Sequence, residues 1–172
     1  EKSGVAVRYV GHPLADLLAE LPAKSAVREE LRVPRDAPVI AMLPGSRVSE
    51  LENMAELFVR TAMKVSEARP GMRFLVPFTN RETRALFEAA LAHVRPAGLE
   101  LSVLIGHSLE AMAAADVVLV ASGTASLEAA LLKRPMVITY RMPRVSWWIM
   151  RRRAYLPSAA LPNILAGAAI AP

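Results

Sequence analysis

The chain has 172 residues and a mass of 18.6 kDa, a length typical of one domain. Hydrophobic residues make up 53% of it and charged residues 22%, which excludes a disordered or low-complexity chain. It has no cysteine, which excludes disulfides and thiolate metal sites and suggests a reducing compartment. Its three histidines lie far apart in the sequence, so we expect no metal centre.

Charge is distributed unevenly along the chain. The net charge is +5, yet residues 1–128 hold 14 basic and 16 acidic side chains. Residues 129–172 hold seven basic side chains and no acidic one. This asymmetry predicts an anionic partner near the C-terminal end, such as phosphate, acidic lipid or nucleic acid.

Two features of the ends bear on the organisation of the protein. The sequence begins with Glu1 rather than methionine and stops within an apolar run, so we expect a fragment of a longer protein. The longest uncharged stretch, residues 154–172, is interrupted by Pro157 and Pro162. We therefore predict neither a membrane-spanning helix nor a signal peptide.

Short apolar runs alternate with helical patterns along the chain. The runs are typical of strands buried on both faces, and they are Val39–Leu43, Phe74–Phe78, Leu101–Ile105, Val117–Ala121 and Met136–Tyr140, with Val5–Val10 as a further candidate. Helical periodicity marks the segments between them, notably Leu51–Ala68, Leu86–Val94, Leu109–Ala115 and Ala125–Lys133. This alternation predicts an α/β fold with a doubly wound parallel sheet. Residues 144–172 do not continue it and read as a helix and a loop.

Ligands of open α/β sheets bind beyond the carboxyl ends of the strands, so the segments after the strands are the candidate sites. The first is Gly45-Ser46-Arg47, which lies between a predicted strand and a helix. Gly45 permits a close approach of backbone amides, the helix N-terminus favours an anion, and Arg47 can bind phosphate oxygens in pairs. The alternative is a tight turn in which Ser46 or Ser49 caps the helix, with Glu50 in its first turn.

Two further segments have the same character. Ser122-Gly123-Thr124 can present hydroxyls and amides to a diphosphate, and Glu128, one helical turn on, can accept hydrogen bonds from a ribose diol. The alternative is that Ser122 or Thr124 caps the helix. Near the C-terminus, Asn163 follows Pro162; it is either a helix cap, which base rates favour, or an amide that contacts a sugar or phosphate.

The histidines offer weaker signals. His107, beside Gly106 in another segment that follows a strand, can touch a base, although a solvated loop residue explains it equally simply. His12 precedes a proline in a turn, which favours a structural role, and His93 falls on the surface of a helix. No spacing suggests a hydrolytic triad.

Aromatic and basic residues adjoin one another in one segment of the C-terminal region. This composition is typical of a membrane interface, with rings at headgroup level and arginines on acidic lipid; the residues concerned are Trp147, Trp148, Arg151, Arg152 and Arg153. A helix packed in the core is the next interpretation. Binding of single-stranded nucleic acid comes last, because the rest of the chain has no basic stripe, and we expect no nucleic-acid partner.

Five motifs occur in the order and spacing of one family. They are Tyr9-Val10-Gly11-His12-Pro13, Leu43-Pro44-Gly45-Ser46-Arg47 with Glu50, Ala121-Ser122-Gly123-Thr124 with Glu128, Pro135 to Met142, and Leu161-Pro162-Asn163-Ile164-Leu165-Ala166-Gly167. In these motifs the chain resembles bacterial lipid-A-disaccharide synthase along essentially its whole length. The loop at residues 154–160 departs from the family by being richer in proline and alanine.

The resemblance implies a fold and a reaction. It implies the C-terminal, donor-binding half of a two-domain GT-B glycosyltransferase, in which residues 1–143 form a Rossmann-like domain and residues 144–172 complete it. The family transfers 2,3-diacylglucosamine from UDP to 2,3-diacylglucosamine 1-phosphate with inversion, releasing UDP without a metal ion or other cofactor. The general base is expected in an N-terminal acceptor domain, so no catalytic residue is expected in this chain.

The resemblance also implies roles for individual residues. Gly45, Ser46 and Arg47 would hold the diphosphate with support from Glu50, and Ser122, Gly123 and Thr124 would line the same site. Glu128 would hold the ribose, Asn163 would complete the site, and Gly106 and His107 would edge the uracil. The partners implied are UDP-diacylglucosamine, an acylated glucosamine phosphate and an acidic membrane surface, with a homodimer of the full-length protein left open. The expected location is the cytoplasmic face of the bacterial inner membrane.

Other functions remain open at this point. One is another GT-B enzyme, such as a UDP-sugar epimerase or a relative of the peptidoglycan N-acetylglucosaminyltransferase. Another is a binding module without catalysis, whose turns are structural and whose basic end docks on lipid. The glycosyl-transfer interpretation requires Arg47 and Thr124 to share one cleft.

Overall fold

The computed structural model describes residues 22–141 and 160–172, together with the single residues Ala6, Arg8, Leu14, Leu18 and Trp148. The described elements alternate between helix and strand in the order α2 (Lys24–Glu30), β1 (Val39–Leu43), α3 (Val48–Ala68), β2 (Arg73–Phe78), α4 (Arg81–Val94), β3 (Glu100–Ile105), α5 (Ser108–Ala114), β4 (Val117–Ala121), α6 (Thr124–Leu131), β5 (Met136–Thr139) and α8 (Leu161–Ala166). The candidate strand Val5–Val10 and the motif that contains His12 fall outside the continuous described ranges.

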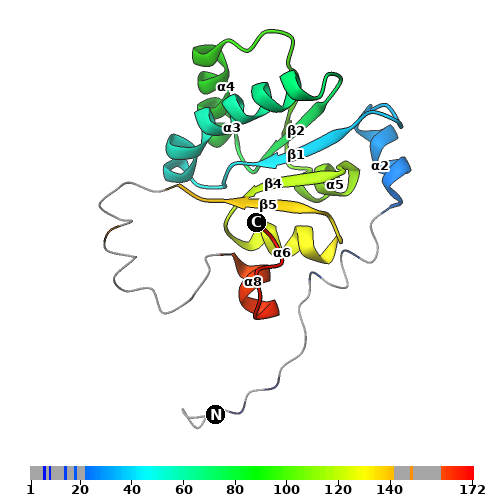
Figure 1. Ribbon diagram of the computed structural model, residues 1–172, viewed down its shortest axis with the longest axis vertical. Coiled ribbons are helices and arrows are strands. Elements are labelled where there is room, and N and C mark those ends of the chain that lie inside the picture. Colours follow the sequence, from blue (N-terminus) through cyan, green and yellow to red (C-terminus); the bar gives the residue numbers. More distant parts are fainter. Residues whose placement is uncertain are drawn as a thin grey trace.

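The five strands form one parallel sheet in the order β3-β2-β1-β4-β5 (Figure 1). Ile40 of β1 pairs with Phe74 of β2 on one side and with Val117 of β4 on the other. Successive strands run outward from β1 in one direction as far as β3, and the chain then returns to β4 and continues the other way. The predicted doubly wound sheet is confirmed, and its order reverses between β1 and β4, which is where such folds bind ligands.

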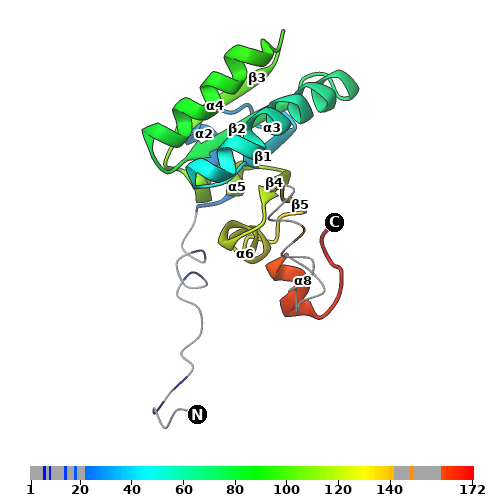
Figure 2. The same ribbon diagram turned by 90° about the vertical axis from the view of Figure 1, so that its left-hand side faces the viewer.

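Helices cover both faces of the sheet (Figure 2). On one face α3 and α4 pack over a cluster that includes Phe58, Phe74 and Phe87. On the other face α2, α5 and α6 pack over smaller side chains, among them Ala41 and the alanines of α5. Because side chains alternate along a strand, β1 contributes Ala41 to one core and Met42 to the other. Burial on both faces explains the continuous apolar runs of the inner strands β1, β2 and β4. The same burial was predicted for β3 and β5, but these lie at the edges of the sheet and are partly exposed.

The strand boundaries agree with the prediction to within a residue, whereas α3 and α4 begin earlier than predicted and α6 ends at Leu131, two residues before its predicted end. Helix α4 begins at Arg81 instead of Leu86, because the Asn80 side chain accepts the Thr83 amide and caps the helix there. Helix α3 begins at Val48, three residues before the predicted start, with Arg47 as its N-cap residue; the Glu50 carboxylate in its first turn accepts the Arg47 amide. Neither Ser46 nor Ser49 is the cap. Strand β5 ends at Thr139 instead of Tyr140, because its partner β4 ends at Ala121, which pairs with Thr139.

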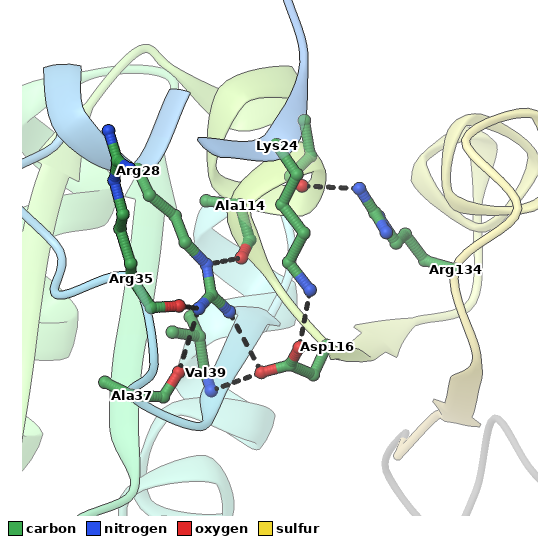
Figure 3. A network of polar contacts seen from close by, with 9 residues as sticks. Lys24, Arg28, Arg35, Ala37, Val39, Ala114, Asp116 and Arg134 are labelled. Atoms are coloured by element: carbon green, nitrogen blue, oxygen red, sulfur yellow. Dashed lines mark hydrogen bonds and ion pairs between the residues drawn. The ribbon is translucent and has the colours of Figure 1, made fainter. Parts of the chain in front are cut away.

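A polar network fixes α2 to the amino ends of β1 and β4 (Figure 3). The guanidinium of Arg28 is buried and donates to the carbonyl oxygens of Ala114, Arg35 and Ala37. It also donates to Asp116 Oδ2 at 3.0 Å, and the same oxygen accepts the Val39 amide at 2.8 Å. Every nitrogen of this buried cation therefore has an acceptor.

Lys24 completes this network by pairing with the other carboxylate oxygen of Asp116. Partial burial by itself raises the pKa of the Asp116 carboxyl, but the hydrogen bonds from Lys24 and Val39 and the charges of Lys24 and Arg28 outweigh it. The net result is a pKa below the usual value for an aspartate. A shallow cavity of about 730 Å³ adjoins this network, on the edge of the sheet opposite to the carboxyl ends of the strands.

Candidate functional site

A cavity of about 630 Å³ lies at the carboxyl ends of the strands. Its walls come from the segments that follow β1, β2, β3 and β4 and from the first residue of α8. Nine of the residues that the sequence analysis selected for UDP binding line it: Gly45, Ser46, Arg47, Glu50, Gly106, Ser122, Gly123, Thr124 and Glu128. Its volume lies in the range of small-molecule sites.

The pairing of β1 with β4 brings the two glycine-containing turns together. Leu43, at the end of β1, is in register with Val120, one residue before the end of β4. The turns that follow these residues consequently open into the same space, although they are far apart in the sequence. Arg47 and Thr124 therefore share one cavity, as the glycosyl-transfer interpretation requires.

The first turn is braced by Glu50. Glu50 Oε2 accepts the amide of Ser46 at 2.9 Å and the amide of Arg47 at 3.3 Å, and the side chain is only 16% exposed. Gly45 packs directly against it: a Cβ at position 45 would lie 2.7 Å from Glu50 Cβ and Oε2, and the φ of Gly45 is +133°. Only glycine accommodates both the contact and the backbone conformation.

This bracing changes how the first turn can bind an anion. The sequence suggested that its backbone amides approach the ligand, but Glu50 already occupies the amides of Ser46 and Arg47. The Arg47 side chain, in contrast, is 79% exposed, and its one ion pair among the described residues places its Nη1 3.3 Å from Glu50 Oε1. An exposed guanidinium held at one nitrogen keeps donors for a phosphate.

The second turn begins α6 without a side-chain cap. Gly123 is the N-cap residue, the Ser126 hydroxyl donates to the Gly123 carbonyl at 2.7 Å, and the Ser122 amide donates to Thr139 of β5 at 2.9 Å. The alternative in which Ser122 or Thr124 caps the helix is wrong. The Ser126 amide donates to the Gly123 carbonyl at 3.2 Å, whereas the amides of Thr124 and Ala125 stand at the helix start, where an α-helix has no carbonyl to offer them. This end of the cavity therefore carries a partial positive charge. Glu128 lines the same cavity one turn further along.

The structure does not bring His107 or Asn163 to the wall of this cavity. His107 adopts a left-handed conformation (φ +57°) as the N-cap of α5, and its Nδ1 lies 3.7 Å from Glu110 Oε1, while its neighbours Gly106 and Ser108 do line the cavity. Asn163 lies inside α8, whose N-cap is Ala160, so it is not the helix cap that base rates favoured. Its side chain forms hydrogen bonds with the backbone of Ile170 and Ala171.

Several residues of the cavity wall were not selected from the sequence: Pro77, Phe78, Thr79, Ser108, Leu109 and Leu161. Pro77, Phe78 and Thr79 lie at and just beyond the end of β2. They follow the rule that ligands bind at the carboxyl ends of the strands, because every strand of a parallel sheet ends at this edge. Thr79 and Asn80, a polar pair directly after an apolar strand, carried the signal that could have found them. Leu161 stands in the motif that the sequence analysis selected, but the residue expected to reach the ligand there was Asn163; that Leu161 lines the cavity instead depends on how α8 packs.

The described residues offer neither a metal site nor a membrane-spanning helix. No group of three or more His, Cys, Asp or Glu side chains among them could hold a metal ion. No helix within the described ranges is long and apolar enough to cross a membrane. Of the residues predicted at the membrane, Trp148 is described and is 56% exposed, whereas Trp147, Arg151, Arg152 and Arg153 lie outside the described residues.

Comparison with known proteins agrees with the geometry. The family model described as lipid-A-disaccharide synthetase matches residues 1–172. The chain is 56% identical over 171 residues to the lipid-A-disaccharide synthase of Methylobacillus flagellatus and 55% identical over 172 residues to that of Azoarcus sp.. It aligns over 99% and 100% of its own length with 45% and 44% of theirs, and so spans less than half of these curated relatives.

A solved structure shows the same fold. The ADP-heptose lipopolysaccharide heptosyltransferase II of E. coli superimposes with a TM-score of 0.55 and 17% identity, over 68% of this chain and 37% of that one. At this identity the likeness concerns the fold alone, that of one Rossmann-like half of a GT-B glycosyltransferase. The match of the family model along the whole sequence and the identity to the curated relatives place this chain in the lipid-A-disaccharide synthetase family.

Proposed function

We propose that this chain is the donor-binding half of an inverting hexosyltransferase of lipid A synthesis. It binds UDP-2,3-diacylglucosamine, whose sugar is transferred to 2,3-diacylglucosamine 1-phosphate with release of UDP. The observation that carries this proposal is the convergence of Arg47, Thr124 and Glu128 on one cavity where the strand order reverses. Membership of the family supports the choice of substrates.

The site fits the electrostatics of glycosyl transfer. When the acceptor hydroxyl attacks the anomeric carbon, the bond to UDP breaks and negative charge grows on the departing diphosphate. The Arg47 guanidinium and the N-terminal end of α6 provide positive potential at this place, present before the reaction begins. The acceptor proton goes to a base that we assign to the part of the protein beyond this chain.

The same positive groups make a metal ion unnecessary for charge stabilisation in this proposal. We therefore expect turnover by the full-length protein to be unchanged after treatment with a chelator. Loss of turnover that Mg²⁺ restores would contradict this part of the proposal.

The decisive test of the site is the titration of UDP by calorimetry, with and without Arg47→Ala. A charge-assisted hydrogen bond is worth roughly 1.5–3 kcal/mol, so the substitution should weaken UDP binding by about tenfold to a hundredfold. Uridine, which lacks the diphosphate, should bind both proteins equally. Because the Arg47 side chain is 79% exposed, the free energy of unfolding should not change. Failure of the wild-type protein to bind UDP would refute the proposed function.

The membrane association implied by the resemblance also stays a proposal. We propose that Trp147, Trp148 and the three arginines at 151–153 hold the protein on the acidic inner face of the bacterial membrane, close to its acylated substrates. The exposure of Trp148 supports it. Sedimentation of the full-length protein with vesicles should require acidic lipid and should decrease when Arg151, Arg152 and Arg153 are replaced by glutamine. Equal sedimentation with neutral vesicles would contradict the proposal.

A further inference from the structure

Asn163 closes the C-terminal segment of the chain, residues 161–172, which we call the clasp. Its Oδ1 accepts the amides of Ile170 at 3.0 Å and Ala171 at 2.9 Å, and its Nδ2 donates to the Ala171 carbonyl at 2.9 Å. Three hydrogen bonds from one side chain thus tie α8 to the residues that follow it. An asparagine side chain satisfies this pattern because it both donates and accepts.

The clasp reverses the chain and joins the edge of the sheet. Gly167 ends α8 in a left-handed conformation (φ +64°), and the Ala168 amide returns to the Asn163 carbonyl at 3.2 Å. At its far end the Ile138 amide of β5 donates to the Pro172 carbonyl at 2.8 Å. The clasp is therefore hydrogen-bonded both to β5 and within itself, and Figures 1 and 2 show α8 and the tail beside α6 and β5.

The other end of the clasp reaches the candidate site. Leu161, the first residue of α8, lines the cavity, whereas Asn163 does not. Pro162 and Ala171 are buried, so both arms of the clasp contribute to packing. The position of Leu161 in the wall thus depends on the contacts that hold α8 in place.

We infer that Asn163 is a positioning residue of the donor site, which acts by locking the clasp and so holding Leu161 in the cavity wall. This inference rests on the proposed function for the identity of the ligand, and on the hydrogen bonds alone for the existence of the lock. It differs from the role that the resemblance implied, in which Asn163 completes the site by direct contact. The two roles predict opposite responses to substitution.

The test compares Asn163→Ala with Asn163→Asp in the full-length protein. The carboxylate of Asn163→Asp still accepts the amides of Ile170 and Ala171, so hydrogen exchange at these amides should stay slower than in Asn163→Ala, where we expect it to accelerate by about tenfold or more. Because Leu161 is apolar, Asn163→Ala should weaken UDP and uridine about equally, on the order of fivefold each. Asn163→Asp should retain more of both affinities. Asn53→Ala is the matched control. Asn53 donates to the Ser49 carbonyl in an exposed hydrogen bond of α3, so its replacement should change neither the exchange rates nor the nucleotide affinities.

Each contrary result has a distinct meaning. Unchanged exchange at Ile170 and Ala171 in Asn163→Ala would overturn the lock itself. Faster exchange with unchanged nucleotide affinity would show that the lock positions nothing in the site. Selective loss of UDP with uridine unaffected, and a larger loss in Asn163→Asp than in Asn163→Ala, would show direct contact with the diphosphate and overturn the inference. If the wild-type protein bound neither ligand, the proposed function would fail, while exchange would still report on the lock.

Discussion

At the scale of single residues, the site depends on one contact between a glycine and a carboxylate. Glu50 can reach the amides of Ser46 and Arg47 only because Gly45 has no side chain to obstruct it. The same carboxylate lies 3.3 Å from Arg47 and restrains the guanidinium without burying it. Gly45 is therefore needed to make room for the Glu50 carboxylate, and the Arg47 side chain is the group of this turn that is available to bind the ligand.

Gly45→Ala tests this dependence, with Gly98→Ala as its control. Both glycines have positive φ, but nothing lies within 4 Å of a Cβ at position 98, whereas a Cβ at position 45 meets Glu50 at 2.7 Å. Gly98→Ala should cost about 1 kcal/mol of unfolding free energy from backbone strain alone and leave UDP binding unchanged. Gly45→Ala should cost more, about 2–3 kcal/mol, and weaken UDP binding as well.

Urea unfolding and calorimetric titration of the two variants measure these quantities. If Gly45→Ala behaved like Gly98→Ala in both experiments, the contact with Glu50 would not control the turn. The comparison separates the strain that any alanine feels at positive φ from the loss of the brace.

At the scale of elements, α2 is attached to the sheet chiefly through the hydrogen bonds and the ion pair of a buried arginine. Val27 and Arg28 are its buried residues, and Arg28 reaches the amino ends of β1 and β4 through Asp116 and backbone carbonyls. This network fastens residues 22–38, a charged segment with three prolines, to the sheet.

The network predicts how stability depends on pH. Because the pKa of Asp116 is lowered in the folded protein, its contribution to stability is complete above the ordinary aspartate pKa of about 3.9 and is lost as the pH falls through the lowered folded value. Asp116→Asn should reduce the free energy of unfolding by about 1–2 kcal/mol at pH 7, since it removes the charged partner of Arg28. The difference from wild type should shrink below about pH 4.

Asp36→Asn is the control for this prediction. Asp36 is exposed beside the same shallow cavity, and no ion pair is recorded for it among the described residues. Its substitution should leave unfolding curves unchanged across the pH range. A difference between wild type and Asp116→Asn that stayed constant down to pH 2 would contradict the proposed linkage.

At the scale of the whole molecule, the site is a property of the strand order. Its wall takes residues from both halves of the sheet, which meet between β1 and β4. A ligand in this cavity should therefore slow hydrogen exchange in the segments after β1 and after β4 together, and at 100 times its Kd it should stabilise the fold by about 2.7 kcal/mol. Exchange measured with and without UDP checks this. Protection confined to one of the two segments would refute a shared cradle.

The sequence was sufficient for the elements and for most of the wall. Apolar runs without alternation identified the five strands; burial on both faces accounts for the runs of β1, β2 and β4, but the edge strands β3 and β5 are partly exposed. The rule that ligands bind beyond the carboxyl ends of strands then selected Gly45, Arg47, Thr124 and Glu128, all of which line the cavity. Helix caps were predicted less well. The preference for serine and threonine is only statistical, and here Arg47 with Glu50 and the backbone of Gly123 took their place.

The family, the parallel α/β fold and the turns that surround the cavity were thus determined by the sequence itself, since each depends on local residue type and spacing. The tertiary structure alone decided three things: the order β3-β2-β1-β4-β5, the occupation of the first turn's amides by Glu50, and the place of Asn163 in a clasp outside the cavity. The reason is physical. Strand order and side-chain hydrogen bonds depend on which segments come into contact after the chain has folded. Short-range sequence patterns do not specify these long-range contacts.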